Sequence, residues 1–153
     1  MRKRIAIVGF ILFFIIGGCE KTNENVSLAD FIEEVKKEAN FQNGVLEDLK
    51  DVSIAQQYGI NPESIKQGYV YYEKDAASSE KIVMLEAVDE KSLEGLEKAV
   101  QNELTGLNET FGENPDEGKK LSESFIKTKG NYVFLVNATE YKTLEKLLNE
   151  KFD

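Results

Sequence analysis

Cys19 is the residue of this chain whose type and position indicate a defined chemistry. It is the only cysteine among 153 residues. Three basic residues, Arg2 to Arg4, open the chain, and residues 5–18 follow without a charged side chain and end in two glycines. This order is typical of a secretory signal that ends at a cysteine whose sulfur receives a diacylglyceryl group. The sequence therefore predicts a signal peptide at residues 1–18 and an acylated Cys19.

The apolar run at residues 5–18 is shorter than a typical membrane-spanning helix. A spanning helix needs about 20 apolar residues, and residues 5–18 fall short of that length. An uncleaved N-terminal anchor remains the alternative. Each buried methylene contributes about 0.8 kcal/mol, so two or three acyl chains such as palmitate hold a protein at a bilayer. We expect a lipid anchor at Cys19 on the outer face of the cytoplasmic membrane, followed by a short polar linker up to residue 26.

The composition excludes several classes of function. Without residues 1–18 the chain has 16 basic residues, all lysine, against 28 acidic ones, a formal net charge of −12. Nucleic-acid binding needs lysine and arginine to neutralise phosphates, so we expect no nucleic-acid partner. The chain has no histidine and no second cysteine, which removes the imidazole base and the usual zinc ligands. We predict no enzymatic activity, no catalytic residue, no metal site and no cofactor.

Carboxylate chemistry is the main catalytic alternative that this composition leaves open. A glycosidase needs two acids about 5 to 10 Å apart, one of them with a raised pKa. Most acids here fall on predicted helix surfaces and turns, but Glu86 lies inside an otherwise apolar strand. The alternation of the strand places Glu86 toward solvent, which is the simpler interpretation. A carboxylate-dependent cell-wall glycan hydrolase therefore stays as the alternative function.

The elements that position these residues begin at recognisable capping residues. Ser27 and Asp30 form a variant of the capping box ahead of a helix whose apolar residues share one stripe. Two Asn-Pro pairs are typical of helix starts, because proline fits the first helical position. A short helix is also predicted over residues 51–58. The predicted N-caps are Ser27, Asn61, Asp89, Asn114 and Thr139.

Four segments have the composition of strands, namely residues 68–74, 81–88, 124–129 and 132–136. Strand, turn, strand and helix follow one another twice. This repeat predicts an α+β fold, with one domain at residues 27–153 and a four-stranded, mainly antiparallel sheet built from two strand-strand-helix units. Both long helices are expected on one face, with the N-terminal helix at an edge or on the opposite face. Asn43-Gly44 is predicted as a turn, and Leu46 and Leu49 are apolar anchors of a segment for which the sequence favours neither helix nor strand.

The order of several short motifs resembles a known family. The motifs are Tyr58-Gly-Ile, Gly68-Tyr-Val-Tyr-Tyr, Ile82-Val-Met-Leu-Glu, Asn114-Pro-Asp-Glu and Lys129-Gly-Asn-Tyr-Val. Over about residues 46–139 they are similar to a bacterial domain-of-unknown-function family that is common in lipoproteins of clostridial-type Gram-positive bacteria. The resemblance implies an extracytoplasmic, usually anchored domain, and it brings no catalytic residue with it.

The central strands are apolar or aromatic on both alternating sets of positions. A sheet covered on one face should instead alternate apolar and polar side chains. Either the first helix covers the second face, or part of an aromatic face is open. The candidate binding face in the open case is Tyr69, Tyr71, Tyr132 and Phe134, although such rings usually belong to the core. We therefore expect a non-catalytic binding or interaction module whose partner is an envelope protein or a small ligand.

Overall fold

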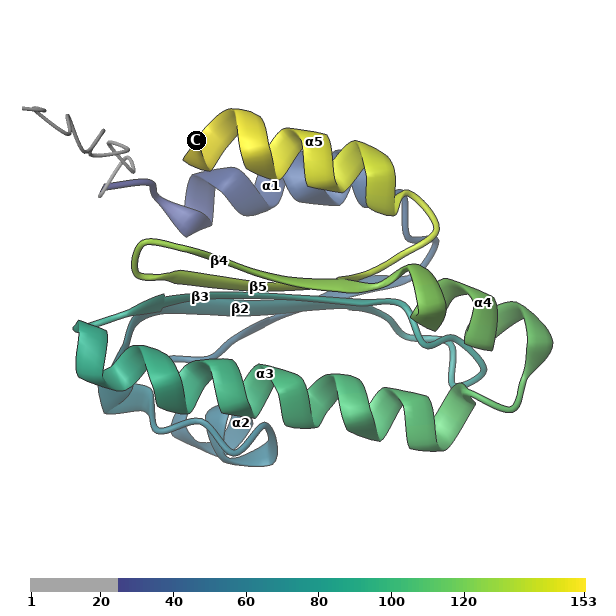
Figure 1. Ribbon diagram of the computed structural model, residues 1–153, viewed down its shortest axis with the longest axis horizontal. Helices are drawn as coiled ribbons and strands as arrows, with labels where there is room; N and C mark the ends of the chain where they lie inside the picture. Colours follow the sequence, from purple (N-terminus) through teal and green to yellow (C-terminus); the bar gives the residue numbers. More distant parts are fainter. Residues whose placement is uncertain (1–24) are drawn as a thin grey trace, which may run out of the picture.

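The computed structural model describes residues 25–153, which form a five-stranded sheet with helices on both faces (Figure 1). All neighbouring strands are antiparallel, in the order β1-β2-β3-β5-β4. The predicted α+β class and antiparallel sheet are confirmed. The elements are α1 (Leu28–Ala39), β1 (Gly44–Asp48), α2 (Val52–Gln57), the 3₁₀ turn η1 (Pro62–Ser64), β2 (Ile65–Glu73), β3 (Lys81–Ala87), α3 (Glu90–Phe111), α4 (Pro115–Glu123), β4 (Phe125–Lys129), β5 (Tyr132–Asn137) and α5 (Tyr141–Phe152).

Most helical elements begin at the predicted caps. The Ser27 hydroxyl oxygen accepts a hydrogen bond from the Asp30 N–H at 3.2 Å. Asn61, Asp89 and Asn114 accept in the same way at the starts of η1, α3 and α4. These side chains satisfy N–H groups that have no partner inside the helix, so polar residues of this kind define where each element begins.

The prediction that Thr139 caps the last helix was wrong. Helix α5 begins at Tyr141, and the residue before it, Glu140, makes no side-chain cap. The N–H and the hydroxyl of Thr139 both donate to Glu80 Oε1 at 2.7 Å. Thr139 therefore ties the β5–α5 connection to the β2–β3 hairpin instead of starting a helix.

The prediction of four strands was also wrong, because β1 is a fifth strand that pairs with β2. Gly44, predicted within a turn, is its first residue and lies opposite Glu73 in the ladder. A Cβ atom at Gly44 would lie 2.0 Å from the Tyr71 hydroxyl oxygen, so glycine allows the strand to approach that ring. The only apolar side chains of β1 are Val45 and Leu46. An edge strand with so few apolar residues gives only a weak sequence pattern.

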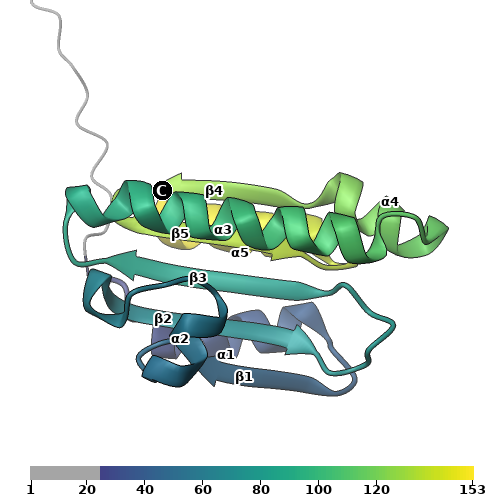
Figure 2. The same cartoon turned by 90° about the horizontal axis from the view of Figure 1, so that it is seen from below.

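The two long helices lie on opposite faces of the sheet, not on one face as predicted (Figure 1). Helices α1 and α5 cover one face, and α3 with α2 covers the other. Figure 2 shows α3 running along β5, with α2 on the β1 and β2 side of the same face. Since both alternating sets of side chains in β3 and β5 are apolar, each face needs its own cover. The most buried residues include Phe31, Met84 and Phe134 in one layer, and Leu49, Val83 and Leu85 in the other.

The predicted signal peptide at residues 1–18 and the acylated Cys19 lie outside the described residues. Between residues 25 and 153, none of the helices combines the length and the apolar character that crossing a bilayer requires.

Candidate functional site

The aromatic residues predicted as a binding face belong mainly to the core. Tyr71 is 5% exposed, Tyr132 2% and Phe134 0%, while Tyr69 is partly buried against the same layer. The Phe152 ring of α5 packs 4.9 Å from the ring centre of Tyr132 and 4.8 Å from that of Phe134. Helices α1 and α5 thus close this face, and the interpretation as an open aromatic surface was wrong.

Little space remains beneath these two helices. A cavity of about 10 Å³ lies between them and the sheet, lined by apolar side chains that include Phe31, Val35, Met84 and Leu144. A volume of about 10 to 15 Å³ is what a single water molecule needs, and an apolar cavity of this kind stays dry. This cavity has no room for a small ligand.

Glu86 is buried, so the expectation that it faces solvent was wrong. Its residue exposure is only 4%. The β2–β3 ladder shifts register between Ile65 and Gln67, which brings two neighbouring side chains to the same carboxylate. Lys66 Nζ lies 3.1 Å from Glu86 Oε1, and Gln67 Nε2 donates to Oε2 at 2.6 Å. A carboxylate held by an ammonium and an amide is arranged as a structural partner, which gives the glycosidase alternative no support.

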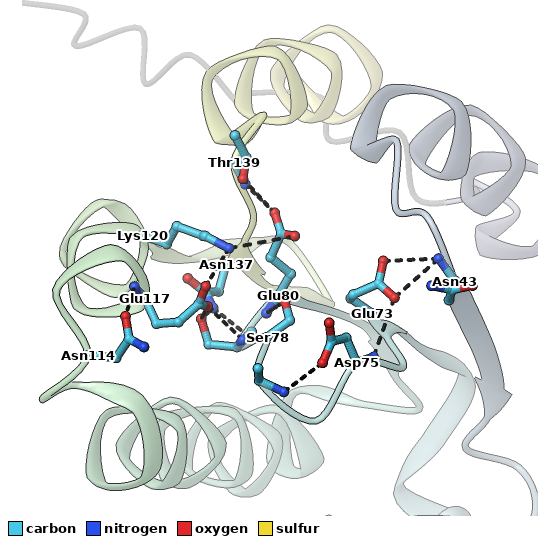
Figure 3. A network of polar contacts seen from close by, with 12 residues as sticks. Asn43, Glu73, Asp75, Ser78, Glu80, Asn114, Glu117, Lys120, Asn137 and Thr139 are labelled. Carbon is cyan, nitrogen blue, oxygen red and sulfur yellow. Dashed lines mark hydrogen bonds and ion pairs between the residues drawn. The ribbon is translucent and has the colours of Figure 1, made fainter.

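A second set of polar side chains lines an open groove at one end of the sheet (Figure 3). The groove measures about 420 Å³ and lies between the β2–β3 connection and α4. Its charged lining consists of four carboxylates and one lysine: Glu73, Asp75, Glu80, Glu117 and Lys120. We call this feature the acidic groove.

Glu117 connects α4 to the β2–β3 connection. Its Oε2 accepts hydrogen bonds from the Ser79 N–H at 2.7 Å and the Ser79 hydroxyl at 2.6 Å, and Lys120 Nζ lies 2.8 Å from Oε1. Asn137 Nδ2 donates to the Ser79 carbonyl oxygen at 2.6 Å, so the end of β5 joins the same network. Burial disfavours the charged form of Glu117, but the hydrogen bonds from Lys120 and Ser79 outweigh it, and the pKa of Glu117 is lowered.

The other carboxylates of the groove are also held by neighbouring loops. Glu80 Oε1 accepts from the N–H and hydroxyl of Thr139, as Figure 3 shows. The Glu73 carboxylate oxygens lie 3.1 and 3.2 Å from the Asn43 nitrogen, and this backbone hydrogen bond lowers the pKa of Glu73. Asp75 Oδ1 accepts from the Ala77 N–H at 2.9 Å. The negative charges are therefore fixed in position around the opening.

The pKa values of the groove carboxylates bear on the acid–base chemistry that they can do. A general acid at neutral pH needs a carboxyl whose pKa is raised. Two carboxyl groups of the groove, those of Glu73 and Glu117, have a lowered pKa instead. Within residues 25–153, no three side chains of the usual metal-binding types come together as a possible metal site. Lys120 pairs with Glu117 and Glu80, but the four carboxylates outnumber it, so the groove keeps a net negative charge that attracts a cationic group.

The sequence did not reveal this groove, because its residues come from separate elements. Ser79 and Glu117 are 38 positions apart, and Ser79 and Asn137 are 58 apart. Asn114-Pro115 indicated only the start of α4. The available signals were the polar segment at residues 75–80 between two apolar strands and the acidic first turn of α4, but neither shows that the two meet.

Residues 38–138 match the family described as Domain of unknown function (DUF4358). The matched part runs from the end of α1 to the β5–α5 connection and contains every strand of the sheet. Comparisons with curated proteins and with solved structures give no match. Because the family match spans more than half of the chain, this protein belongs to the DUF4358 family of domains of unknown function.

Proposed function

We propose that this protein is a lipid-anchored, extracytoplasmic binding module without catalytic activity, and that its acidic groove receives a positively charged group of an envelope partner. The observation that carries the binding proposal is the set of four fixed carboxylates around an open groove, with Lys120 as the only lysine in its lining. The anchoring proposal is supported by the order of basic residues, apolar run and Cys19 at the N-terminus.

The geometry of the groove indicates the chemistry of its partner. Backbone N–H groups already orient Glu73 and Asp75, so their charge needs little rearrangement on binding. The groove of about 420 Å³ accommodates one or two long side chains, which fits a lysine-rich segment of another protein. Exposed ion pairs contribute about 0.2 to 1 kcal/mol each. We therefore expect weak, salt-dependent binding to which several carboxylates contribute.

Anchoring is tested on the native product in its own membranes. Mass spectrometry should find diacylglyceryl and acyl groups on a chain that begins at Cys19, and Cys19→Ala should move the protein out of the membrane fraction. An unmodified thiol, or a chain that still begins at Met1 and is recovered from the cytosol, would contradict this part of the proposal.

Binding is tested by titrating the full-length protein with a tetralysine peptide at low ionic strength. Asp75→Asn combined with Glu80→Gln should weaken binding about fivefold, as expected for the loss of about 1 kcal/mol of ion pairing. The matched control is Glu94→Gln together with Glu97→Gln, which removes two charges from α3 instead. If the control weakens binding equally, the attraction comes from net charge and the acidic groove is not the site.

A further inference from the structure

The first described residues are held by hydrogen bonds at the end of the sheet opposite the acidic groove. The Val26 N–H donates to the Tyr132 hydroxyl oxygen at 3.0 Å, and that hydroxyl lies 3.2 Å from the Val26 carbonyl oxygen, to which it donates. Gln67 Nε2 donates to the same carbonyl at 3.0 Å, and Gln67 Oε1 accepts from the Leu28 N–H at 2.7 Å. We call Val26, Leu28, Gln67, Tyr132 and Glu86 the N-terminal clasp.

The side chains of the clasp are themselves held in place. Gln67 Nε2 also donates to the buried Glu86 carboxylate at 2.6 Å, which fixes the orientation of the amide. Burial raises the pKa of Tyr132, and the negative charge of Glu86 adds to this effect, so the hydroxyl remains a hydrogen-bond donor. The clasp thus binds main-chain groups of Val26 and Leu28 through side chains that have little freedom to move.

The clasp and the acidic groove lie at opposite ends of the central strands. Tyr132 is the first residue of β5, whereas Asn137, beside the groove, is its last. Gln67 and Glu73 are six positions apart in β2, which corresponds to about 20 Å along the strand. In Figures 1 and 2, α4 accordingly lies at the opposite end of the sheet from the beginning of α1.

We propose that the clasp fixes which end of the domain faces the membrane, so that the acidic groove points away from the bilayer. This inference rests on the proposed acyl anchor at Cys19. Cys19 and Val26 are seven positions apart, and a random-coil chain of that length has an end-to-end distance of about 15 Å. This end-to-end distance is shorter than the distance of about 20 Å along β2 between the clasp and the acidic groove. The clasp end is therefore the one that reaches the bilayer without stretching the linker.

The orientation is measured with one fluorophore at each end of the full-length protein. Glu63→Cys places a thiol in η1 at the clasp end, and Asp116→Cys places one in α4 at the groove end. Both residues are exposed, and both changes remove one acid. Each protein is reconstituted in phosphatidylethanolamine–phosphatidylglycerol vesicles that carry an energy acceptor on the lipid headgroup. We expect greater energy transfer from position 63 than from position 116.

Variants of the clasp test its role in this orientation. Gln67→Ala with Tyr132→Phe should bring the two transfer efficiencies closer together, whereas Gln101→Ala, an exposed glutamine of α3, should leave the difference unchanged. Hydrogen exchange of the Leu28 amide should become about fivefold or more faster in the double variant, as expected for the loss of one hydrogen bond. If the double variant unfolds, Tyr132→Phe alone retains the buried ring and is measured in the same way.

Two outcomes would overturn the inference while the anchor is intact. One is transfer from position 116 that equals or exceeds transfer from position 63. The other is a clasp variant that exchanges faster at Leu28 but keeps the full difference between the two positions. Failure of the proposed anchoring is detected separately, by fractionation of the unlabelled protein, which would then be absent from the membrane fraction.

Discussion

The two ends of the sheet use buried carboxylates in different ways. At the clasp end, Glu86 binds two side chains, Lys66 and Gln67, and through Gln67 it helps to hold the N-terminal segment. At the groove end, Glu117 accepts directly from a buried backbone N–H, that of Ser79, and belongs to a group of carboxylates around an opening. At the clasp end the carboxylate holds the start of the domain, whereas at the groove end the carboxylates lie around an opening near the surface.

Loss of Glu117 should destabilise the fold more than loss of Glu86, because their partners differ in exposure. The side chain of Lys66 is 49% exposed, so water can solvate its ammonium if Glu86 is lost. Ser79 is 1% exposed, and both its N–H and its hydroxyl donate to Glu117, so in the folded protein these two donors depend on that carboxylate. An unsatisfied buried donor costs more than an exposed ion pair contributes. We therefore expect the groove end to be more sensitive to single substitutions than the clasp end.

The largest effect is expected for Glu117→Ala. Removal of the carboxylate leaves the two donors of Ser79 without their acceptor, and hydrogen bonds to charged groups contribute about 1.5 to 3 kcal/mol. We expect a loss of about 3 kcal/mol in the free energy of unfolding, measured by urea denaturation. Asp116→Ala is the control in the same helix, and its effect should stay within about 0.5 kcal/mol because Asp116 is exposed. Equal losses for the two variants would contradict the role assigned to Glu117.

The second-largest effect is expected from acid, which should lower the free energy of unfolding through the carboxylates at the groove end. The folded protein lowers the pKa of Glu117 and Glu73 below their ordinary value of 4.5. In the window between that value and the lowered pKa, the unfolded chain binds more protons than the folded one. Stability is therefore fully present above about pH 5 and falls as the pH decreases through this window.

The acid effect is checked by urea midpoints at a series of pH values from neutral to acidic. Glu117→Gln should be less stable than wild type at neutral pH, but it should lose less stability on acidification, since one of the titrating carboxyls is gone. Glu94→Gln is the control on an exposed helix surface. A Glu117→Gln protein with the same acid-induced loss as wild type would show that this carboxyl does not contribute to the pH dependence.

Much of the fold could be predicted from the sequence, because its signals are local. Ser27, Asn61, Asp89 and Asn114 each cap an element from a position two or three residues ahead of the donor. The apolar stripe predicted for α1, which consists of Leu28, Phe31, Ile32, Val35 and Ala39, repeats at helical spacing and is buried in the structure. Both periodicity and capping depend on neighbours within one turn, so one sequence is enough to find them.

The arrangement of the two ends could not be predicted, because it depends on contacts between distant segments. Tyr132 and Val26 are 106 positions apart, and Gln67 and Val26 are 41 apart. No periodicity connects such residues. The uniformly apolar strands β3 and β5 did contain a usable signal, since they require a cover on both faces. This signal led to the first helix as one possible cover of the second face, and α1 does lie there, but it did not indicate that α5 joins α1 on that face.

A smaller effect is expected for Glu86→Gln at the clasp end. The amide still offers an oxygen to Gln67 Nε2, and Lys66 can turn toward water, so about 1 kcal/mol of stability should be lost. Urea denaturation measures this, with Glu117→Gln as the matched change at the other end. Glu86→Gln also tests the hydrolase alternative in a cell-wall digestion assay. Digestion by wild type that is lost in Glu86→Gln would revive that alternative, whereas we expect no digestion by either protein.

The smallest effect is expected for Thr139→Ala, which distinguishes a loop contact from a helix cap. Thr139 is exposed, and its hydroxyl donates to Glu80 rather than to the first turn of α5. Because the backbone N–H still reaches Glu80 in the variant, about 0.5 kcal/mol should be lost and the hydrogen exchange of α5 should not change. Ser27→Ala at the cap of α1 is the reference, where about 1 kcal/mol is expected together with faster exchange in the first turn. If Thr139→Ala also exposes the first turn of α5 to exchange, Thr139 stabilises that helix, and the polar network at the groove end would extend into the layer that covers the aromatic core.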